Sequence, residues 1–197
     1  MFNFALTMKR IRIALFISGN GSNARNIINY FENHAQMSVS LVLSSAQNDL
    51  MDEFCAERAI LFAHPSGMNG DAYLKYCQKQ EIDWVILAGF LKKIPIDFIN
   101  AFPNRIINIH PALLPNFGGK GMYGKHVHEA VAKNSVRFSG ITIHLVNEEF
   151  DKGKMLAQFA VALQNPRSAV EIESQVRDLE IVHFPSVIES VLLDSTL

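Results

Sequence analysis

The 197-residue chain has only two cysteines and no long apolar run, and each shortage excludes a class of protein. Cys55 and Cys77 lie 22 positions apart, which fits neither a disulfide framework nor a C-x-x-C site. We therefore expect two reduced core thiols and a cytoplasmic protein. The longest apolar stretch, Trp84–Leu91, is far shorter than the ~20 residues needed to cross a bilayer, so no membrane association is expected.

An excess of charge of either sign is also missing, because 18 Lys and Arg stand against 19 Asp and Glu. A formal charge of −1 argues against a strongly basic nucleic-acid binder and against an acidic disordered chain. With 49% hydrophobic residues, the chain can bury a sizeable core. We expect one domain over residues 1–197, in which residues 1–8 form a ragged lead-in.

Apolar strands and amphipathic helices alternate through the first half of the chain. Strands are predicted at residues 10–17, 37–43, 61–63, 83–88 and 105–109. Helices are predicted at residues 22–33, 48–59, 71–80 and 95–101. After a further helix at about 126–133, two extended strands follow at 138–146 and 155–163, and a last helix at 169–193. The pattern predicts an α/β fold: an open, mostly parallel, Rossmann-like sheet with helices on both faces and an antiparallel C-terminal strand pair.

A glycine-containing loop follows the first predicted strand and opens the first helix. Its sequence at residues 18–23 is Ser-Gly-Asn-Gly-Ser-Asn, with Ser22 as the expected helix cap. Backbone N–H groups and the helix dipole at such a position can hold a phosphate. The alternative is that the glycines only make a tight turn. The spacing also fits a dinucleotide fingerprint, but no acid follows the second strand before Asp49, which weakens a nicotinamide dehydrogenase interpretation.

A second group of polar residues lies at the end of the strand that closes the parallel part of the sheet. Asn108 and His110 alternate along this strand, so both side chains point to one side near its carboxyl end. Ligands bind at that end in open α/β sheets. An amide is a neutral donor, and a histidine can act as acid, base or oxyanion donor near neutral pH. The Pro-bounded loop that follows favours a functional interpretation over a structural one.

A third group comprises Thr142, His144 and Asp151. Thr142 and His144 share a strand face, and Asp151 lies in the connection that follows. An aspartate beside a histidine can fix its tautomer and stabilise the imidazolium. The sequence leaves open whether Asp151 pairs with His110 or with His144, and a turn aspartate next to glycine is also common.

The pair His126-x-His128 is the strongest metal candidate, and the sequence does not favour it. Helix positions i and i+2 do not share a face, and no Cys or carboxylate stands at ligand spacing. We therefore expect no metal.

Taken together, these motifs resemble the folate-dependent formyltransferases. Leu87-Ala88-Gly89-Phe90 stands at the end of the central strand, and Asn108-Ile109-His110-Pro111 stands at the end of the next strand. Thr142, His144 and Asp151-x-Gly153 then follow along the chain, in the order that the family shows. The similarity spans about residues 11–190 and is strongest to members that use glycinamide ribonucleotide as formyl acceptor. It implies transfer of the formyl group of 10-formyltetrahydrofolate, as co-substrate, to the amine of that ribonucleotide in purine synthesis, with no metal and no covalent intermediate, by a monomer or homodimer.

The resemblance also assigns residues. Asn108, His110 and Asp151 match the family's catalytic residues, and Thr142 and His144 would support them. Asn108 and protonated His110 would stabilise the developing oxyanion, and Asp151 would hold His110 and help move a proton from the attacking nitrogen. The remaining matches are Gly21, Ser22 and Asn23 for the substrate phosphate, Glu180 for its ribose, and Leu87, Phe90, Leu91, Lys92, Ile94 and Asn108 for folate.

Two features depart from the family pattern. Lys93 stands where many relatives have an apolar residue in the folate segment, and the loop at residues 117–124 is longer than the usual Pro-Gly turn. A methionyl-tRNA formyltransferase would need a further tRNA-binding domain and is not expected here. The remaining alternatives are a formyltetrahydrofolate hydrolase, which uses water as acceptor, and a folate- or nucleotide-binding module that performs no catalysis.

Overall fold

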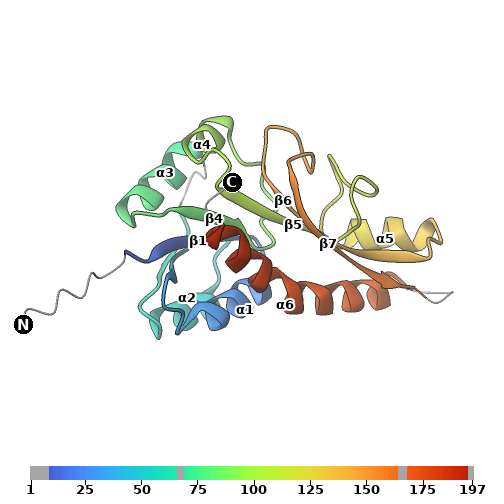
Figure 1. Ribbon diagram of the computed structural model, residues 1–197, viewed down its shortest axis with the longest axis horizontal. Coiled ribbons are helices and arrows are strands. Elements are labelled where there is room, and N and C mark those ends of the chain that lie inside the picture. The colour runs from blue at the N-terminus through green and yellow to red at the C-terminus, as the bar shows by residue number, and fades with distance from the viewer. Residues whose placement is uncertain (1–8, 66–68, 164–167, 195–197) are drawn as a thin grey trace, which may run out of the picture.

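A seven-stranded sheet runs through the centre of the computed structural model, which describes residues 9–65, 69–163 and 168–194 (Figure 1). The lead-in expected at residues 1–8 lies outside the described residues. The strands are β1 (Ile11–Ile17), β2 (Met37–Ser44), β3 (Leu61–Ala63), β4 (Trp84–Leu87), β5 (Ile106–His110), β6 (Phe138–Leu145) and β7 (Met155–Ala162). The helices are α1 (Ser22–Phe31), α2 (Asp49–Ala56), α3 (Gly70–Lys79), α4 (Ile96–Ala101), α5 (Lys125–Lys133) and α6 (Ala169–Leu193).

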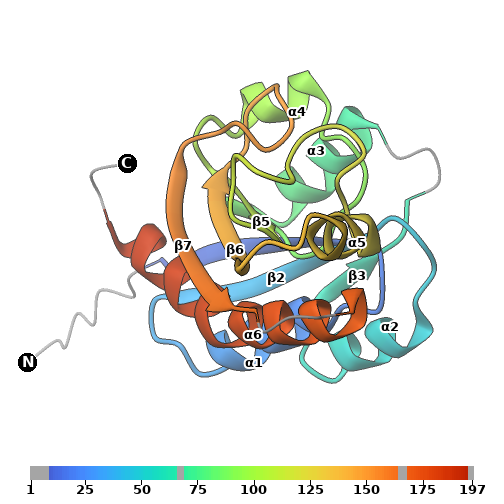
Figure 2. The ribbon, with the colours of Figure 1, turned by 90° about the vertical axis from the view of Figure 1, so that its right-hand side faces the viewer.

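The strand order β3-β2-β1-β4-β5-β6-β7 confirms the predicted α/β fold. The first five strands pair in parallel, whereas β6 pairs antiparallel with both β5 and β7. Helices α3 and α4 cover one face of the sheet, and α1, α2 and α6 cover the other (Figures 1 and 2). From β1 the chain adds β2 and β3 on one side of the sheet, and then adds β4 and the later strands on the other side. Open α/β sheets bind ligands at the carboxyl ends of the strands at this change of direction, which here lies between β1 and β4.

Each face of the sheet has its own hydrophobic core. One core joins the strands to the apolar sides of α1, α2, α5 and α6, and the other joins them to α3 and α4. Because β1 and β4 lie between these two cores, their side chains are buried on both faces, and this explains the unbroken apolar runs in their sequences. Cys55 and Cys77 are free, buried thiols, as predicted, and burial raises their pKa values to about 11 and about 12.

Two helices end earlier than predicted. The helix expected over 48–59 ends at Ala56, because the chain turns back through a left-handed residue, Ala59, and the N–H of Ile60 bonds to the carbonyl of Cys55. The helix expected over 22–33 ends at Phe31. Neither turn contains a glycine or proline, the two residues that mark the end of a helix most strongly.

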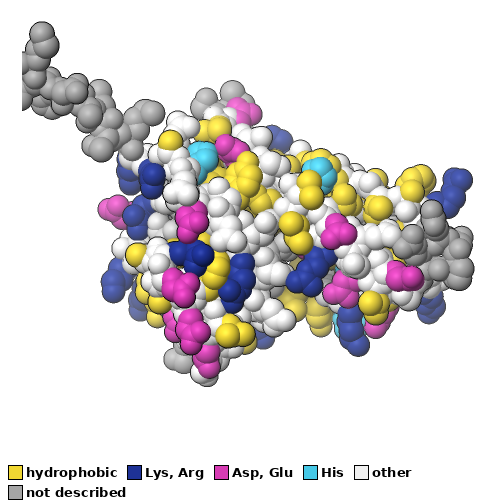
Figure 3. All heavy atoms as spheres, turned by 90° about the horizontal axis from the view of Figure 1, so that it is seen from below, with side chains coloured by type: hydrophobic (Ala, Val, Ile, Leu, Met, Phe, Trp, Pro, Cys, Tyr) yellow, Lys and Arg dark blue, Asp and Glu magenta, His cyan; other side chains and the backbone are white. Residues whose placement is uncertain are grey.

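The face formed by α1, α2 and α6 carries charges of both signs with scattered hydrophobic side chains (Figure 3). Tyr30, Ile181 and Val182 are among its exposed apolar residues. Scattered exposure of this kind is ordinary on protein surfaces. None of the helices in the described part of the chain has the length and apolar character required to cross a membrane.

Gly140 of β6 has no room for a side chain, because β7 lies directly against it. A Cβ at this position would lie 2.0 Å from the carbonyl oxygen of Phe159 and 2.9 Å from Cα of Ala160. Both are backbone atoms of β7, so the two strands must separate to admit a methyl group. We expect Gly140→Ala to lower the free energy of unfolding by about 3 kcal/mol, as measured by urea denaturation.

Gly19→Ala is the matched control, because a Cβ there meets nothing within 4 Å. We expect Gly19→Ala to change the free energy of unfolding by no more than about 0.5 kcal/mol. Similar urea midpoints for the two variants would contradict the packing argument.

Candidate active site

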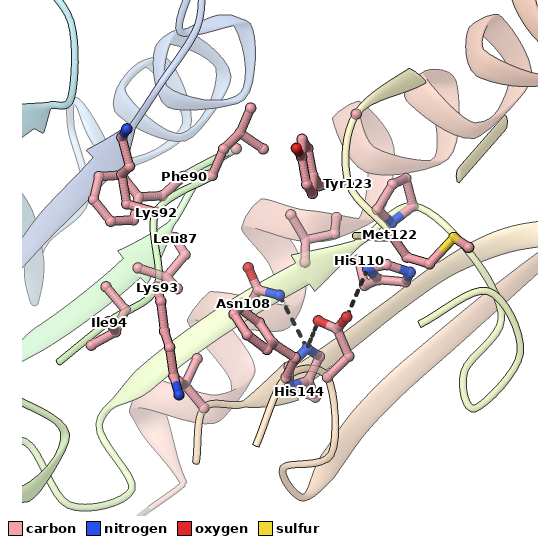
Figure 4. Close-up of a pocket in the computed structure, with 18 of the residues that line it drawn as sticks. Leu87, Phe90, Lys92, Lys93, Ile94, Asn108, His110, Met122, Tyr123 and His144 are labelled. Atoms are coloured by element: carbon pink, nitrogen blue, oxygen red, sulfur yellow. Dashed lines mark hydrogen bonds and ion pairs between the residues drawn. The ribbon is translucent and has the colours of Figure 1, made fainter. Parts of the chain in front are cut away.

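A cavity of about 530 Å³ opens at the carboxyl ends of β1, β4 and β5. Its walls come from residues 87–94, the loop at 119–124, the connection at 146–151 and one side of α6. Figure 4 shows Leu87, Phe90 and Ile94 on one side, Met122 and Tyr123 on the other, and Asn108 and His110 between them. The cavity therefore gathers members of all three groups of polar residues that the sequence singled out.

The start of α1 forms one end of this cavity. Gly21, not Ser22, is the N-cap, which corrects the prediction: Gly21 has a left-handed backbone with φ 74°, and Ser22 is already helical. The helix has no side-chain cap, so no side-chain oxygen competes with an external anion for its first N–H groups. Ser22 and Asn23 line the cavity, whereas Gly21 does not line it and supplies only the turn.

Ser18 connects the loops that follow three strands. Its N–H donates to the carbonyl of Gly89 at 3.1 Å, and its Oγ accepts the N–H of Leu91 at 2.9 Å. The hydroxyl of Ser45, after β2, lies 2.7 Å from the same Oγ. These bonds fix the segment predicted to face folate beside the start of α1.

The segment at residues 87–94 brings the residues predicted to face folate to the wall of the cavity. Leu87, Phe90, Leu91, Lys92 and Ile94 all line the cavity. Lys93, the departure from the family pattern, also lines it and lies over the ring of Phe150, with 5.4 Å from its Nζ to the ring centroid. The two lysine side chains point to opposite sides of the segment (Figure 4).

His110 lies at the end of β5 and is almost fully buried. Its Nε2 donates to the carbonyl of Phe117 at 2.8 Å, and its Nδ1 lies 3.6 Å from Oδ2 of Asp151. Burial lowers the pKa of His110, although Asp151 and the Phe117 carbonyl act in the opposite direction. The ring is therefore a buried group whose charge depends on two nearby acceptors.

Asp151 contacts both candidate histidines, so the choice between them that the sequence left open does not arise. Its other oxygen, Oδ1, lies 3.7 Å from Nε2 of His144. Burial alone would raise the pKa of Asp151, but His144, the N–H of Gly119 and His110 outweigh it, and the pKa is lowered. The glycine of the Asp-x-Gly motif lets the chain pass here, because a Cβ at Gly153 would lie 1.7 Å from the carbonyl oxygen of Leu145.

His144 fixes the orientation of Asn108. Its Nδ1 donates to the carbonyl of Leu145 at 2.8 Å, and its Nε2 lies 3.1 Å from Nδ2 of Asn108. The amide nitrogen of Asn108 carries a second hydrogen, and Asn108 lines the cavity. An N–H donor is thus available beside His110.

Thr142 supports the site from outside the cavity. Its hydroxyl donates to the carbonyl of Ala112 at 2.7 Å and accepts the N–H of Leu114 at 3.0 Å and the amide of Gln158 at 2.9 Å. It does not line the cavity. Thr142 therefore holds the Pro-bounded loop after His110 and does not face a ligand.

One side of α6 contributes three charged residues, of which the sequence analysis named only Glu180. Glu173, Arg177 and Glu180 all line the cavity. Glu180 accepts a hydrogen bond from the amide of Asn23 at 2.8 Å, and burial raises its pKa against the effect of that bond. Glu173, Arg177 and Glu180 are four and three residues apart, so their side chains lie on one stripe of the helix. This spacing could have led from Glu180 to Glu173 and Arg177 in the sequence.

The His126-x-His128 pair divides as its spacing predicts. His126 is exposed and lies beside Glu129, whereas His128 is buried, lines the cavity and has an Nδ1 without a hydrogen-bond partner among the described residues. In residues 9–65, 69–163 and 168–194, no cluster of three or more His, Cys, Asp or Glu is placed to hold a metal ion.

His128 is expected to make the protein less stable in acid. Burial lowers its pKa, whereas an unfolded histidine titrates near 6.5. Between these two pKa values the unfolded state binds more protons, so the free energy of unfolding falls as the pH falls. We expect His128→Gln to lose less stability than the wild type between pH 7 and pH 5, as measured by urea denaturation at both values.

The comparison of the two proteins is necessary because the raised pKa of Glu180 contributes to the pH dependence of stability with the opposite sign. Glu180 is present in both proteins, so its contribution cancels in the difference. Equal losses in the two proteins would show that His128 titrates alike in the folded and unfolded states.

Comparisons with known proteins show which family the chain is similar to. A family model described as formyl transferase matches residues 11–188. Two plant proteins named phosphoribosylglycinamide formyltransferase, chloroplastic, are similar: that of Arabidopsis thaliana is 41% identical over 78% of this chain, and that of Vigna unguiculata is 38% identical over 94%. This chain spans 56% and 62% of their lengths, respectively. The phosphoribosylglycinamide formyltransferase of Bacillus subtilis is 31% identical, with 92% of this chain and 94% of the relative covered.

Solved structures give the same result. The crystal structure of phosphoribosylglycinamide formyltransferase from Anaplasma phagocytophilum superposes with a TM-score of 0.83 at 27% identity, covering 93% of this chain and 87% of that one. The enzyme of the same name from Streptococcus pneumoniae superposes with a TM-score of 0.79 at 29% identity, covering 94% and 99%.

Proposed function

Because the chain belongs to the formyl transferase family, we propose that it transfers the formyl group of 10-formyltetrahydrofolate to the amine of glycinamide ribonucleotide, a step of purine biosynthesis. The observation that carries the proposal is the convergence of Asn108, His110 and Asp151 on one cavity whose far end is the uncapped start of α1. An acceptor whose phosphate lies at the start of α1 can bring its amine to the formyl group beside Asn108, His110 and Asp151. We further propose that residues 1–197 act as one formyltransferase domain in the cytoplasm.

The start of α1 binds the phosphate of the acceptor. Backbone N–H groups at Ser22 and Asn23 are pre-oriented donors, and the helix dipole favours negative charge there. Arg177 lines the same cavity and supplies a full positive charge. Glu180, held by Asn23, then accepts hydrogen bonds from the ribose hydroxyls. This assignment leaves the amine end of the acceptor near His110.

The segment at residues 87–94 binds the folate. Leu87, Phe90, Leu91 and Ile94 supply apolar surface for a flat aromatic ring system, and the backbone of the same segment supplies polar groups. Lys92 attracts the anionic tail of the folate. The formyl group then lies between this segment and the end of β5.

The reaction follows from the groups at the end of β5. As the amine adds to the formyl carbon, negative charge develops on the formyl oxygen, and the N–H donor of Asn108 and the positive charge of protonated His110 stabilise it. Asp151 keeps the imidazolium in place and accepts the proton that the attacking nitrogen loses. The proton finally passes to the folate nitrogen that leaves.

The deciding experiment measures folate release from 10-formyltetrahydrofolate with and without glycinamide ribonucleotide. Release only in the presence of the ribonucleotide, lost in His110→Ala, supports the transferase. Release without any acceptor supports the hydrolase, and no release in either case leaves a binding module. The first outcome is the expected one.

Glu180 tests the acceptor end of the site. We expect Glu180→Gln to raise KM for glycinamide ribonucleotide roughly tenfold or more, since the hydrogen bonds of a charged acceptor weaken. The kcat value should change little, because Glu180 lies away from the reacting atoms. Steady-state kinetics with the acceptor varied at saturating folate measures both constants.

Asp178→Asn is the control for this prediction. Asp178 is exposed on the same helix and does not line the cavity, so its removal changes the net charge equally without touching the site. An equal rise in KM in the two variants would mean that only long-range charge is involved.

A further inference from the structure

The turn at residues 117–119 binds both members of the His110–Asp151 pair through its main chain. The carbonyl of Phe117 accepts from Nε2 of His110 at 2.8 Å, and the N–H of Gly119 donates to Oδ2 of Asp151 at 2.8 Å. The same Oδ2 lies 3.6 Å from Nδ1 of His110. The turn and the pair therefore form one closed ring of polar contacts.

The backbone conformation of the turn makes this ring possible. Phe117 and Gly119 both have left-handed backbones, with φ values of 55° and 94°. Gly118, between them, lies against the pair: a Cβ there would be 3.4 Å from Cβ of Asp151 and 2.4 Å from Cδ2 of Leu114. The turn is thus packed onto Asp151 with no room for a side chain.

The ring of contacts favours particular charges. Both nitrogens of His110 face acceptors, and an imidazole can donate from both only when it is protonated. Asp151 in turn receives a main-chain donor, which favours the carboxylate. The other titratable groups near His110 are His144 on β6, which disfavours a positive charge on it, and His128 on α5, whose own pKa is lowered by His110. Only Asp151 and the turn favour it, against the effect of burial.

We propose that the Phe117–Gly119 turn is a positioning element that supports the doubly protonated form of His110 and the ionised form of Asp151. The same loop continues into Lys120, Met122 and Tyr123, which line the cavity. A ligand that contacts those residues therefore contacts the loop that carries this turn. The catalytic consequence rests on the proposed function, but the effect on protonation does not.

Two glycines of this loop provide a matched test. Gly119 and Gly121 have nearly the same backbone, with φ values of 94° and 89°, and a Cβ on either meets nothing within 4 Å. Alanine strains both positions equally, but only Gly119 donates to Asp151. The variants are Gly119→Ala and Gly121→Ala, and the measurement is an NMR titration of ¹⁵N-histidine-labelled protein without substrate, with the His110 signal assigned from His110→Ala.

In Gly119→Ala we expect the pKa of His110 to fall below that of the wild type and kcat to fall about tenfold. In Gly121→Ala we expect the titration of His110 to stay where it is. If Gly119→Ala does not fold, Gly118→Ala displaces the same turn through contact with Asp151 and Leu114. The proposal is overturned if the pKa of His110 is unchanged in Gly119→Ala and Gly118→Ala, or if Gly121→Ala shifts that pKa as much as Gly119→Ala does. A shifted titration in a protein without formyl transfer would reject the proposed function and retain the role of the turn.

Discussion

Replacing His110 by alanine is expected to lower kcat for formyl transfer by roughly a thousandfold or more, the range found when a general acid and an oxyanion donor are lost together. The protonated ring places a positive charge at the end of β5, beside Asn108, where the formyl oxygen is proposed to lie. Its removal also leaves the carbonyl of Phe117 and the carboxylate of Asp151 without their shared partner. Stopped-time assays with both substrates saturating measure the effect.

Binding should survive the same change. The phosphate end at Ser22 and the apolar segment at residues 87–94 are separate walls of the cavity, and His110 belongs to neither. We therefore expect the KM values for both substrates to change by less than about fivefold. This split between kcat and KM distinguishes a catalytic role from general damage to the cavity.

His126→Ala is the control for His110→Ala. His126 is half exposed, lies beside Glu129 and does not line the cavity, so turnover should stay at the wild-type level. Full turnover in His110→Ala would reject its catalytic role and leave the stabilisation of the oxyanion to Asn108 alone.

The fold was predictable from the sequence because its signals are local. Strands such as β4 lie between two helical layers, so their sequences are unbroken apolar runs. The alternation of these runs with amphipathic helices implies a parallel sheet. The cap of α1 was predicted wrongly because Gly21 and Ser22 are both acceptable at that position, and only the left-handed backbone of Gly21 decides between them. The early end of α2 at Ala56 depends on a turn without glycine, which has no sequence signal.

The site was predictable where strand periodicity controls it. Asn108 and His110 alternate on one strand, so their common direction follows from a period of two. The partner of Asp151 was not predictable, because it depends on how the connection after β6 folds back over β5. The answer, that Asp151 contacts both His110 and His144, requires the register in which Asn108 lies opposite His144.

The contribution of α6 was only partly predictable. Glu173 and Arg177 stand on the same stripe as Glu180, but a charged stripe on a helix usually faces solvent. It faces the cavity here because α6 packs across α1 and β6 and brings Glu180 to Asn23, 157 positions earlier in the chain. Contacts over such a separation leave no periodic trace in one sequence.

Replacing Asp151 by asparagine is expected to lower kcat at pH 7 by roughly a hundredfold. The amide keeps the shape of the side chain but cannot accept a proton from the attacking nitrogen. It also removes the negative charge that favours the imidazolium form of His110. Both effects reduce the rate of the chemical step, whereas the walls that bind phosphate and folate remain.

The pH profile separates these two effects. Since Asp151 acts to raise the pKa of His110, its loss lowers that pKa further, and the fraction of protonated His110 falls at every pH above it. In Asp151→Asn the decline of kcat on the alkaline side should therefore begin at a lower pH than in the wild type. Glu129→Gln, on α5 and paired with Lys125 outside the cavity, should leave the profile in place. An unchanged alkaline limb in Asp151→Asn with a reduced maximum would assign the whole effect to proton acceptance and none to the charge of His110.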